Sequence, residues 1–421
     1  RLARADISAL INDTGRTMTG SRRTRRVLAG FVIAEIAVAV ALVAGAVRLM
    51  RSFENIQSVE PGFHVARQTV LDVVHADRRY QDADQMRAWW DTVQARLHAA
   101  GAAQVATTSS MPLRHDWDFT TFADLKSQPG VPPDQRPNGR IRFASPEFFS
   151  VMGISLVRGR AFTDRDRPGS PPVAIVNQAF VRRFMGATDP LRDSLKGFSN
   201  KIVDGKLVRE DAAIVGVAAD VKYSALTDPA EPLIYVPPHE VNLLRQSIIV
   251  TSSDGRTLPV PALRAAIRDV DPNVAIEVQT MADVVSGSMN RERLGMLLMS
   301  LFGATALVLA IVGVFGVLGY VVSQRTAELA VRQALGATRA QVFRMVVGDG
   351  GRFAVAGIAI GLFGSWWSGT LMRRYLFEVD AADPIVLGGS AALVATAAML
   401  AVIIPARRAA ALEPTQALRN P

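Results

Sequence analysis

Four apolar stretches limit what this chain of 421 residues can fold into. They cover residues 27–50, 294–322, 353–371 and 385–404. Each has about the 20 residues that an α-helix needs to cross the hydrocarbon core of a bilayer. The first contains only Glu35 and Arg48 as charged residues and is not followed by a small-residue cleavage site, so it predicts a membrane helix and not a secretory signal. The stretches therefore argue against a single water-soluble globule.

Arginines beside the stretches indicate how the chain crosses the membrane, because Lys and Arg near helix ends stay on the cytoplasmic side. Basic segments lie before the first stretch, between the second and third, and after the fourth: Arg22, Arg23, Arg25 and Arg26; Arg325, Arg332, Arg339 and Arg344; Arg407 and Arg408. Residues 373–384 have no positive excess. We therefore expect a multi-pass protein of the cell inner membrane, with both termini cytoplasmic and residues 51–293 extracytoplasmic.

These assignments divide the chain into nine segments. We expect a cytoplasmic segment at 1–26, a membrane helix at 27–50, an extracytoplasmic domain at 51–293 and a second membrane helix with a stalk at 294–322. Next come a cytoplasmic helix and loop at 323–345 and a third membrane helix at 346–372. The chain ends with an external loop at 373–384, a fourth membrane helix at 385–404 and a cytoplasmic tail at 405–421. The predicted fold class is an α+β integral membrane protein, in which one transmembrane helix precedes a large inserted α/β domain and three follow it.

The extracytoplasmic domain shows a repeated order of elements. Alternation and apolar runs predict a first unit with a strand at 68–74, a helix at 82–100 and a strand at 104–108. They predict a second unit with strands at 212–217 and 247–251, a helix at 258–270 and a strand at 274–278. Between the halves, residues 173–177 predict a strand that leads into a helix at 178–185. This order predicts a split α/β subdomain, about 65–112 and 212–285, with an inserted subdomain at about 113–211.

No pattern in the chain indicates catalysis or metal binding. Cys is absent, which excludes disulfide scaffolds, thiolate metal sites and thiol nucleophiles. The five His residues lack paired spacing such as HExxH, and neither a GxSxG elbow nor a GxxxxGK[ST] phosphate loop occurs. The net charge of +9 does not indicate a nucleic-acid partner, since the basic clusters flank membrane helices, where they suit topology and contact with anionic lipid.

The predicted cytoplasmic loop contains an amphipathic helix. At 100° per residue, one face gathers Ala327, Ala330, Val331, Ala334 and Leu335, and the opposite face gathers Arg325, Glu328, Leu329, Arg332 and Arg339. Gly336 predicts the end of this helix, and Thr338 with Gln341 forms a capping box that begins the next one. The helix either rests on lipid headgroups through its arginines or docks a soluble partner through Leu329 and the paired charges.

Two cytoplasmic motifs carry a resemblance to a known family. RTAELAVRQALGATRAQV (325–342) and PARRAAALEPTQALRN (405–420) look like the MacB/FtsX type of ABC-transporter permease. FFSVMGISLVRGRAF (148–162), PPVAIVNQAFVRRF (171–184) and IVGVAADV (214–221) resemble the MacB-like periplasmic core. The resemblance implies one helix before the periplasmic domain and three after it, which agrees with the topology expected from charge.

The resemblance also implies partners. Permeases of this type bind ABC ATPase subunits, so ATP and Mg²⁺ are expected on the partner, with no cofactor bound by this chain. The residues that the resemblance assigns to ATPase coupling are Glu328, Leu329, Arg332, Ala334, Leu335 and Gly336. A second permease unit is expected as a homodimer or a fused pseudo-dimer. The initial RLARADISALIND is similar to ARRAAALEPTQALRN (406–420), as though another permease unit ended just before this one.

Several positions inside the membrane stretches admit two interpretations. Gly313, Gly316 and Gly319 in the second stretch, and Gly357 and Gly361 in the third, allow close helix approach within one subunit or across a dimer. Glu35 in the first stretch is an intramembrane ionisable residue, which is functional by default. It could instead pair with an arginine at 22–26 or extend to the lipid headgroups.

These observations predict the permease subunit of a MacB-like ABC transporter, which performs no catalysis itself. Mechanotransmission of ATP hydrolysis to the extracytoplasmic domain would drive efflux or export, or mechanical work on a periplasmic or outer-membrane partner. The alternative is a membrane-anchored receptor or sensor that binds an extracytoplasmic ligand and is not coupled to an ATPase.

Overall fold

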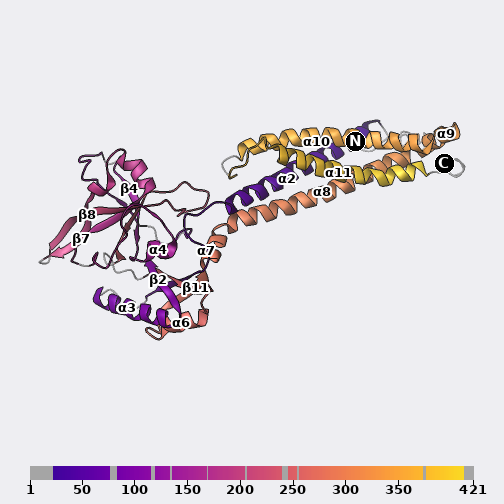
Figure 1. Ribbon diagram of the computed structural model, residues 1–421. Helices are drawn as coiled ribbons and strands as arrows, with labels where there is room; N and C mark the ends of the chain where they lie inside the picture. The colour runs from indigo at the N-terminus through magenta and orange to yellow at the C-terminus, as the bar shows by residue number, and fades with distance from the viewer. Residues whose placement is uncertain are drawn as a thin grey trace, which may run out of the picture. The chain divides into compact units, whose positions relative to one another are not determined.

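The computed structural model describes residues 22–75, 83–114, 119–132, 135–167, 169–203, 206–238, 245–253, 256–372 and 376–411. The chain forms two compact units (Figure 1). The helical unit consists of Arg1–Ser58 and Arg291–Pro421, and the α/β unit of Val59–Asn290.

The helical unit contains four helices that are long and apolar enough to cross a membrane. They are α2 (Arg22–Gln57), α8 (Asn290–Gln324), α10 (Arg339–Leu371) and α11 (Pro384–Ala410), and the short α9 (Thr326–Ala334) joins α8 to α10. One long helix precedes the α/β unit and three follow it, as predicted. α10 begins earlier than the predicted membrane span because the capping box forms: Thr338 Oγ accepts from Gln341 N, and Gln341 Oε1 accepts from Thr338 N at 2.8 Å.

Small residues bring α10 directly against α2. A Cβ added at Gly357 would lie 2.7 Å from Cβ of Ile36, and one added at Gly361 would lie 2.6 Å from Cβ of Val40. These two glycines therefore pack helices of the same subunit. A buried apolar cluster continues this contact to α8 and α11: Val32, Ile36, Val40, Val43, Val314, Leu318, Val394, Ala401 and Val402.

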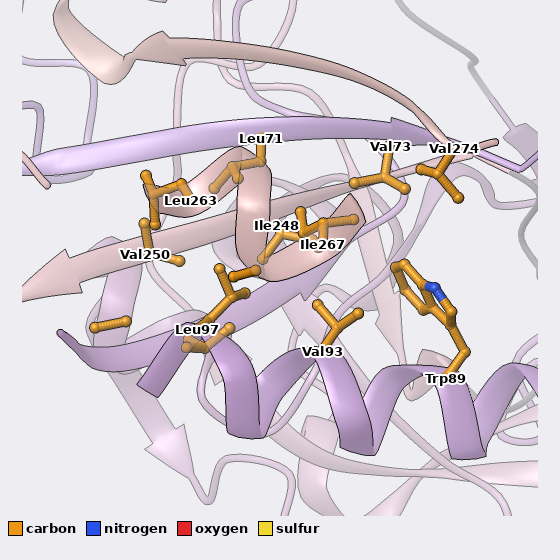
Figure 2. Close-up of a cluster of buried hydrophobic side chains, with 13 residues drawn as sticks. Leu71, Val73, Trp89, Val93, Leu97, Ile248, Val250, Leu263, Ile267 and Val274 are labelled. Carbon is orange, nitrogen blue, oxygen red and sulfur yellow. The ribbon is translucent and has the colours of Figure 1, made fainter. Parts of the chain in front are cut away.

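The first layer of the α/β unit is a four-stranded antiparallel sheet in the order β11-β1-β10-β2. Its strands are β1 (Gln68–Val74), β2 (Ala102–Thr108), β10 (Arg245–Ser252) and β11 (Ala275–Thr280). α3 (Ala83–Ala99) and α6 (Val260–Arg268) cover one face, where Trp89, Val93 and Leu97 point toward the strands (Figure 2). Each such fully buried apolar side chain contributes roughly 1.5–3 kcal/mol. The elements predicted at 68–74, 82–100, 247–251 and 258–270 are all present.

The second layer is a seven-stranded mixed sheet. Its strand order is β3-β4-β9-β6-β8-β5, with β7 paired to β8. The strands are β3 (Phe119–Phe122), β4 (Asn138–Phe143), β5 (Leu156–Gly159), β6 (Val173–Asn177), β7 (Ser194–Val203), β8 (Lys206–Ala218) and β9 (Leu233–Val236). Short helical segments complete the unit: α4 (Phe148–Met152), α5 (Gln178–Phe180), a π-turn (Val181–Met185), a 3₁₀ turn (Pro190–Arg192) and α7 (Met281–Ser288).

The sheet assignment corrects one predicted boundary. The sequence placed residues from 212 onward in the split subdomain, but β8 pairs in parallel with β6 and β9 pairs with both β4 and β6. The second layer therefore extends to Val236, and the chain returns to the first sheet at β10. An apolar strand shows in the sequence that it is buried, but not which of two sheets it joins.

Candidate functional site

The region expected to couple to an ATPase is α9 and the turn that follows it, at one end of the helical unit (Figure 1). Gly336 adopts the left-handed conformation with φ of 103°, which favours glycine. In the same turn the N–H of Ala337 donates to the carbonyl of Arg332 at 3.0 Å. The chain then enters α10 at Thr338, so α9 is held between two defined ends.

The buried side of α9 differs from the predicted one. Leu329 and Ala330 are 2% and 0% exposed, whereas Val331 is 46% and Leu335 84% exposed. Leu329 packs with Val342 and Val346 of α10 and with Ala406 and Ala409 of α11. The expected grouping of Leu329 with the outward polar residues is therefore wrong. Contact with α10 and α11 sets the rotation of α9, because the apolar Leu329 buries itself against these two helices.

The exposed side of α9 carries an ordered set of charges. Glu328 Oε1 pairs with Arg332 Nη2 at 2.8 Å, four residues apart on the helix. Arg325 Nη1 pairs with Asp349 of α10 at 3.3 Å, and its Nε lies 3.9 Å from Glu328. Of the six predicted coupling residues, five are exposed on or beside α9: Glu328, Arg332, Ala334, Leu335 and Gly336. The sixth, Leu329, lies beneath them as the anchor.

The predicted packing glycines have three different surroundings. Gly357 and Gly361 contact α2, as described above. Gly313 of α8 faces the carboxylate of Glu35, whose Oε2 is buried and accepts no hydrogen bond from the described residues. Gly316 and Gly319 face open space, since a Cβ on either would meet no atom within 4 Å. The predicted pairing of Glu35 with the arginines at 22–26 stays a prediction, because the side chains of residues 22–25 lie outside those that the structure describes.

A polar cluster that sequence reasoning missed joins the end of α2 to the segment between α10 and α11. We call Arg48, Arg51, Ser52 and Asn55, together with their partners at 376–383 and Ser365, the Arg48 cluster. Arg48 is 3% exposed and donates to Ser365 Oγ at 2.8 Å and to the carbonyl of Ala381 at 3.0 Å. The only sequence signal was Arg48 itself, one of two charges in the first apolar stretch.

The other members of the Arg48 cluster fix the same segment. Ser52 Oγ accepts from the N–H of Phe377 at 2.9 Å, and Asn55 Nδ2 donates to the carbonyl of Glu378 at 3.0 Å. Arg51 forms an ion pair with Asp383, which caps α11. Burial opposes ionisation of Asp383, but the N–H groups of Ile385 and Val386, together with Arg51, lower its pKa below the ordinary value.

Nothing in the described residues resembles a metal centre. No group of three or more His, Asp or Glu side chains among them is arranged to hold a metal ion. The site offers a binding surface: the exposed apolar side chain of Leu335 lies beside the pair Glu328–Arg332, on a helix that Leu329 packs against α10 and α11. Such a mixture is typical of a protein interface.

Two family models match successive parts of the chain. The model described as MacB-like periplasmic core domain matches residues 30–284, more than half of the chain, and the one described as FtsX-like permease C-terminal matches residues 300–414. The chain belongs to the MacB/FtsX-like permease family. This membership confirms the predicted fold class and identifies the chain as an ABC-transporter permease, with the α/β unit as its MacB-like core.

Relatives of this permease are 23–24% identical to it over the aligned residues. An uncharacterized ABC transporter permease of Bacillus subtilis, YknZ, is 23% identical over 286 residues, covering 65% of this chain and 68% of that protein. The macrolide export ATP-binding/permease protein MacB of Burkholderia pseudomallei is 24% identical over 309 residues, covering 67% of this chain and 43% of that protein. A probable syringafactin export ATP-binding/permease protein of Pseudomonas syringae is 23% identical, covering 67% of this chain and 42% of that protein. This permease thus spans less than half the length of the relatives that are named ATP-binding/permease proteins.

Solved structures similar to this permease match about half of the chain. The periplasmic region of MacB from Actinobacillus actinomycetemcomitans is 14% identical, with a TM-score of 0.35, and the match covers 56% of this chain and 98% of that one.

Proposed function

We propose that this chain is the permease subunit of an ABC transporter whose ATPase is a separate protein that docks on the exposed face of α9. The observation that carries the proposal is the arrangement of this helix. Leu329 anchors it to α10 and α11, while Leu335 and the pair Glu328–Arg332 remain exposed beside each other. In this proposal the chain performs no catalysis, and the partner ATPase binds Mg²⁺ and hydrolyses ATP.

The contacts within the helical unit would carry a displacement of α9 along its length. Leu329 ties α9 to both α10 and α11, and Arg325 ties the start of α9 to Asp349 of α10. At the other end of these helices, the Arg48 cluster ties residues 376–383 to α2. A force on α9 therefore acts on α10 and α11 together and reaches α2, which continues along the chain into the MacB-like core.

The membrane orientation belongs to the same proposal. The arginines beside the four helices support a cytoplasmic location for both termini and α9, and a location outside the inner membrane for the MacB-like core. Two relatives are named for export, one of macrolides and one, as a probable exporter, of syringafactin. For this chain we propose efflux, export or mechanical work on an envelope partner, carried out by two permease units.

Capture of an ATPase tests the docking surface. The full chain is solubilised in detergent and mixed with candidate ABC ATPase subunits, as native sequence and as Glu328→Arg or Leu335→Asp. Glu292→Arg makes the same charge reversal at an exposed position in the first turn of α8 and is the matched control. We expect native chain and Glu292→Arg to retain the ATPase and the two α9 variants to lose it.

Two outcomes would contradict the proposal. If no ATPase binds, or if all four proteins bind it equally, α9 is not the coupling element. A response of the MacB-like core to an extracytoplasmic ligand without nucleotide would then favour the membrane-anchored receptor.

A further inference from the structure

A groove lies between α8 and α11, near the end of the helical unit that carries α9. It encloses about 280 Å³, close to the lower limit of the roughly 300–1,000 Å³ of small-molecule pockets. Its apolar lining includes Gly316, Gly319 and Val322, and its polar lining is Ser323, Thr326 and Arg408. All of these residues belong to the helical unit.

The groove runs along two glycines of α8 that have no side chain to fill it. A Cβ added at Gly316 or Gly319 would meet nothing within 4 Å. Gly303 on the same helix differs, since a Cβ there would lie 3.4 Å from the carbonyl oxygen of Leu42 on α2. α8 therefore uses its earlier small residues for packing on α2 and leaves Gly316 and Gly319 open.

One end of the groove carries a cation. Arg408 is exposed, in the last turn of α11, with its guanidinium carbon 5.9 Å from the ring centroid of Phe315. At this end the described residues form ion pairs between Arg325 and Asp349, Arg325 and Glu328, Arg332 and Glu328, and Arg352 and Asp349, and none of these pairs includes Arg408. Arg408 lines the groove together with Ser323 and Thr326.

The apolar and cationic parts of the groove lie at different depths. Gly316 and Gly319 precede the end of α8 at Gln324 by about 7 to 12 Å at 1.5 Å per residue, inside the apolar span, whereas Arg408 lies at the end of α11. An occupant that fits both parts has an apolar chain and an anionic head. A neutral apolar helix of a second copy would fill the slot but leave the guanidinium without a countercharge.

We infer that this groove binds one anionic phospholipid of the cytoplasmic leaflet, with an acyl chain along Gly316 and Gly319 and the headgroup phosphate at Arg408. Basic residues at the cytoplasmic surface favour anionic lipid by about 1 kcal/mol each, which corresponds to a roughly fivefold preference. The leaflet rests on the orientation proposed above. The fit of the lipid to the groove rests on the geometry alone.

Lipid retention by the purified full chain tests the inference. The detergent-solubilised protein is incubated with equal amounts of dioleoyl phosphatidylglycerol and dioleoyl phosphatidylcholine and washed, and the retained lipid is quantified by mass spectrometry. We expect native protein to retain phosphatidylglycerol about fivefold over phosphatidylcholine. R408Q should abolish the preference, and G319L, which fills the slot, should reduce retention of both lipids.

Matched controls separate a site from general charge and surface effects. R407Q removes the neighbouring exposed charge, and G364L adds the same side chain at an exposed glycine of α10 where a Cβ also meets nothing within 4 Å. Both should behave as native protein. Equal loss in R407Q and R408Q, or native behaviour of R408Q or G319L, would overturn the inference.

Cross-linking tests the competing occupant. Because the native chain contains no Cys, G316C introduces a single thiol. Disulfide-linked dimers of G316C would show that a second copy occupies the groove and would overturn the lipid site, and monomeric G316C supports it. Neither measurement involves an ATPase, so failure of the lipid site and failure of the docking surface are distinguishable.

Discussion

The carboxylate of Glu35 on α2 lies against Gly313 of α8, where a Cβ would overlap Oε2. Around this contact the two helices meet through small side chains, since Ala39, Ala306 and Ala310 form a buried cluster with Leu42 beside it. The carboxylate therefore fits between the helices only because position 313 has no side chain. Position 316, one turn further along α8, carries no such requirement.

Gly313→Ala should destabilise the helical unit by about 1 kcal/mol, the low end of the cost of an extra methyl group in a packed contact, because the atoms that must move belong to the flexible end of the Glu35 side chain. Gly316→Ala is the control and should be neutral or slightly stabilising, because Ala favours a helix over Gly. Thermal unfolding of the detergent-solubilised chain measures both. Adding Glu35→Ala to Gly313→Ala should restore part of the loss. If adding Glu35→Ala restores none of the loss, the Glu35 carboxylate does not lie against position 313.

Alanine substitutions at Leu329 and Leu335 should affect different properties, the first the stability of the helical unit and the second the binding of the ATPase. Leu329→Ala removes a side chain that is 2% exposed and should cost about 2–5 kcal/mol, whereas Leu335→Ala changes one that is 84% exposed and should stay within about 0.5 kcal/mol. Leu335→Ala should nevertheless weaken ATPase capture. Unfolding curves and capture assays on the same preparations check the two effects, and a stability loss in Leu335→Ala equal to that of Leu329→Ala would contradict the burial of α9 described above.

The sequence allowed some of these features to be predicted and hid others for physical reasons. The four membrane helices follow from length and apolarity, and β1 and α6 follow from local patterns. The rotation of α9 does not, because Leu329 is buried by residues more than ten positions away on α10 and α11. The contact between Arg48 and Ser365 joins residues 317 positions apart, and no local pattern reports such a pairing.

Two tyrosines of the MacB-like core should respond in opposite ways to loss of their hydroxyl groups. Tyr235 is fully buried and its hydroxyl has no hydrogen-bond partner among the described residues, so burial raises its pKa. Tyr235→Phe should therefore be neutral or stabilise the core by about 1 kcal/mol. Tyr223→Phe removes a donor to the carbonyl of Ser110 and should cost about 1 kcal/mol. Chemical denaturation measures both, and a larger loss in Tyr235→Phe would reveal a partner for that hydroxyl.

Asp166 should make the stability of the MacB-like core depend on pH. Burial disfavours its ionised form, but hydrogen bonds from Arg160 and Thr163 outweigh this effect and lower its pKa. Because the folded pKa lies below the unfolded value of about 3.9, the contribution is complete above that value and is lost as the pH falls through the folded pKa. The stability difference between native protein and Asp166→Asn should be constant above about pH 5 and shrink below about pH 4. A difference that stays constant down to pH 3 would contradict the lowered pKa, and Thr163→Val should reduce the dependence.

Arg48→Ala should destabilise the helical unit without affecting the docking surface. Its loss leaves the buried Ser365 hydroxyl and the carbonyl of Ala381 without their donor, and hydrogen bonds to a charged group contribute about 1.5–3 kcal/mol each. We expect a loss of about 3 kcal/mol or more in thermal unfolding. Arg352→Ala is the control, since its 85% exposed side chain forms only a surface pair with Asp349 at 3.7 Å and should contribute less than about 1 kcal/mol.

The functional readout of Arg48→Ala distinguishes docking from transmission. Because α9 and the Arg48 cluster share no described contact, the variant should capture the ATPase as native protein does at a temperature where both are folded. If the cluster carries movement from α10 and α11 to α2, the captured ATPase should still hydrolyse ATP, but the MacB-like core should not change conformation in response. Limited proteolysis of the core measures this conformational change. An unchanged proteolytic response in Arg48→Ala would show that movement reaches the core through α8 instead.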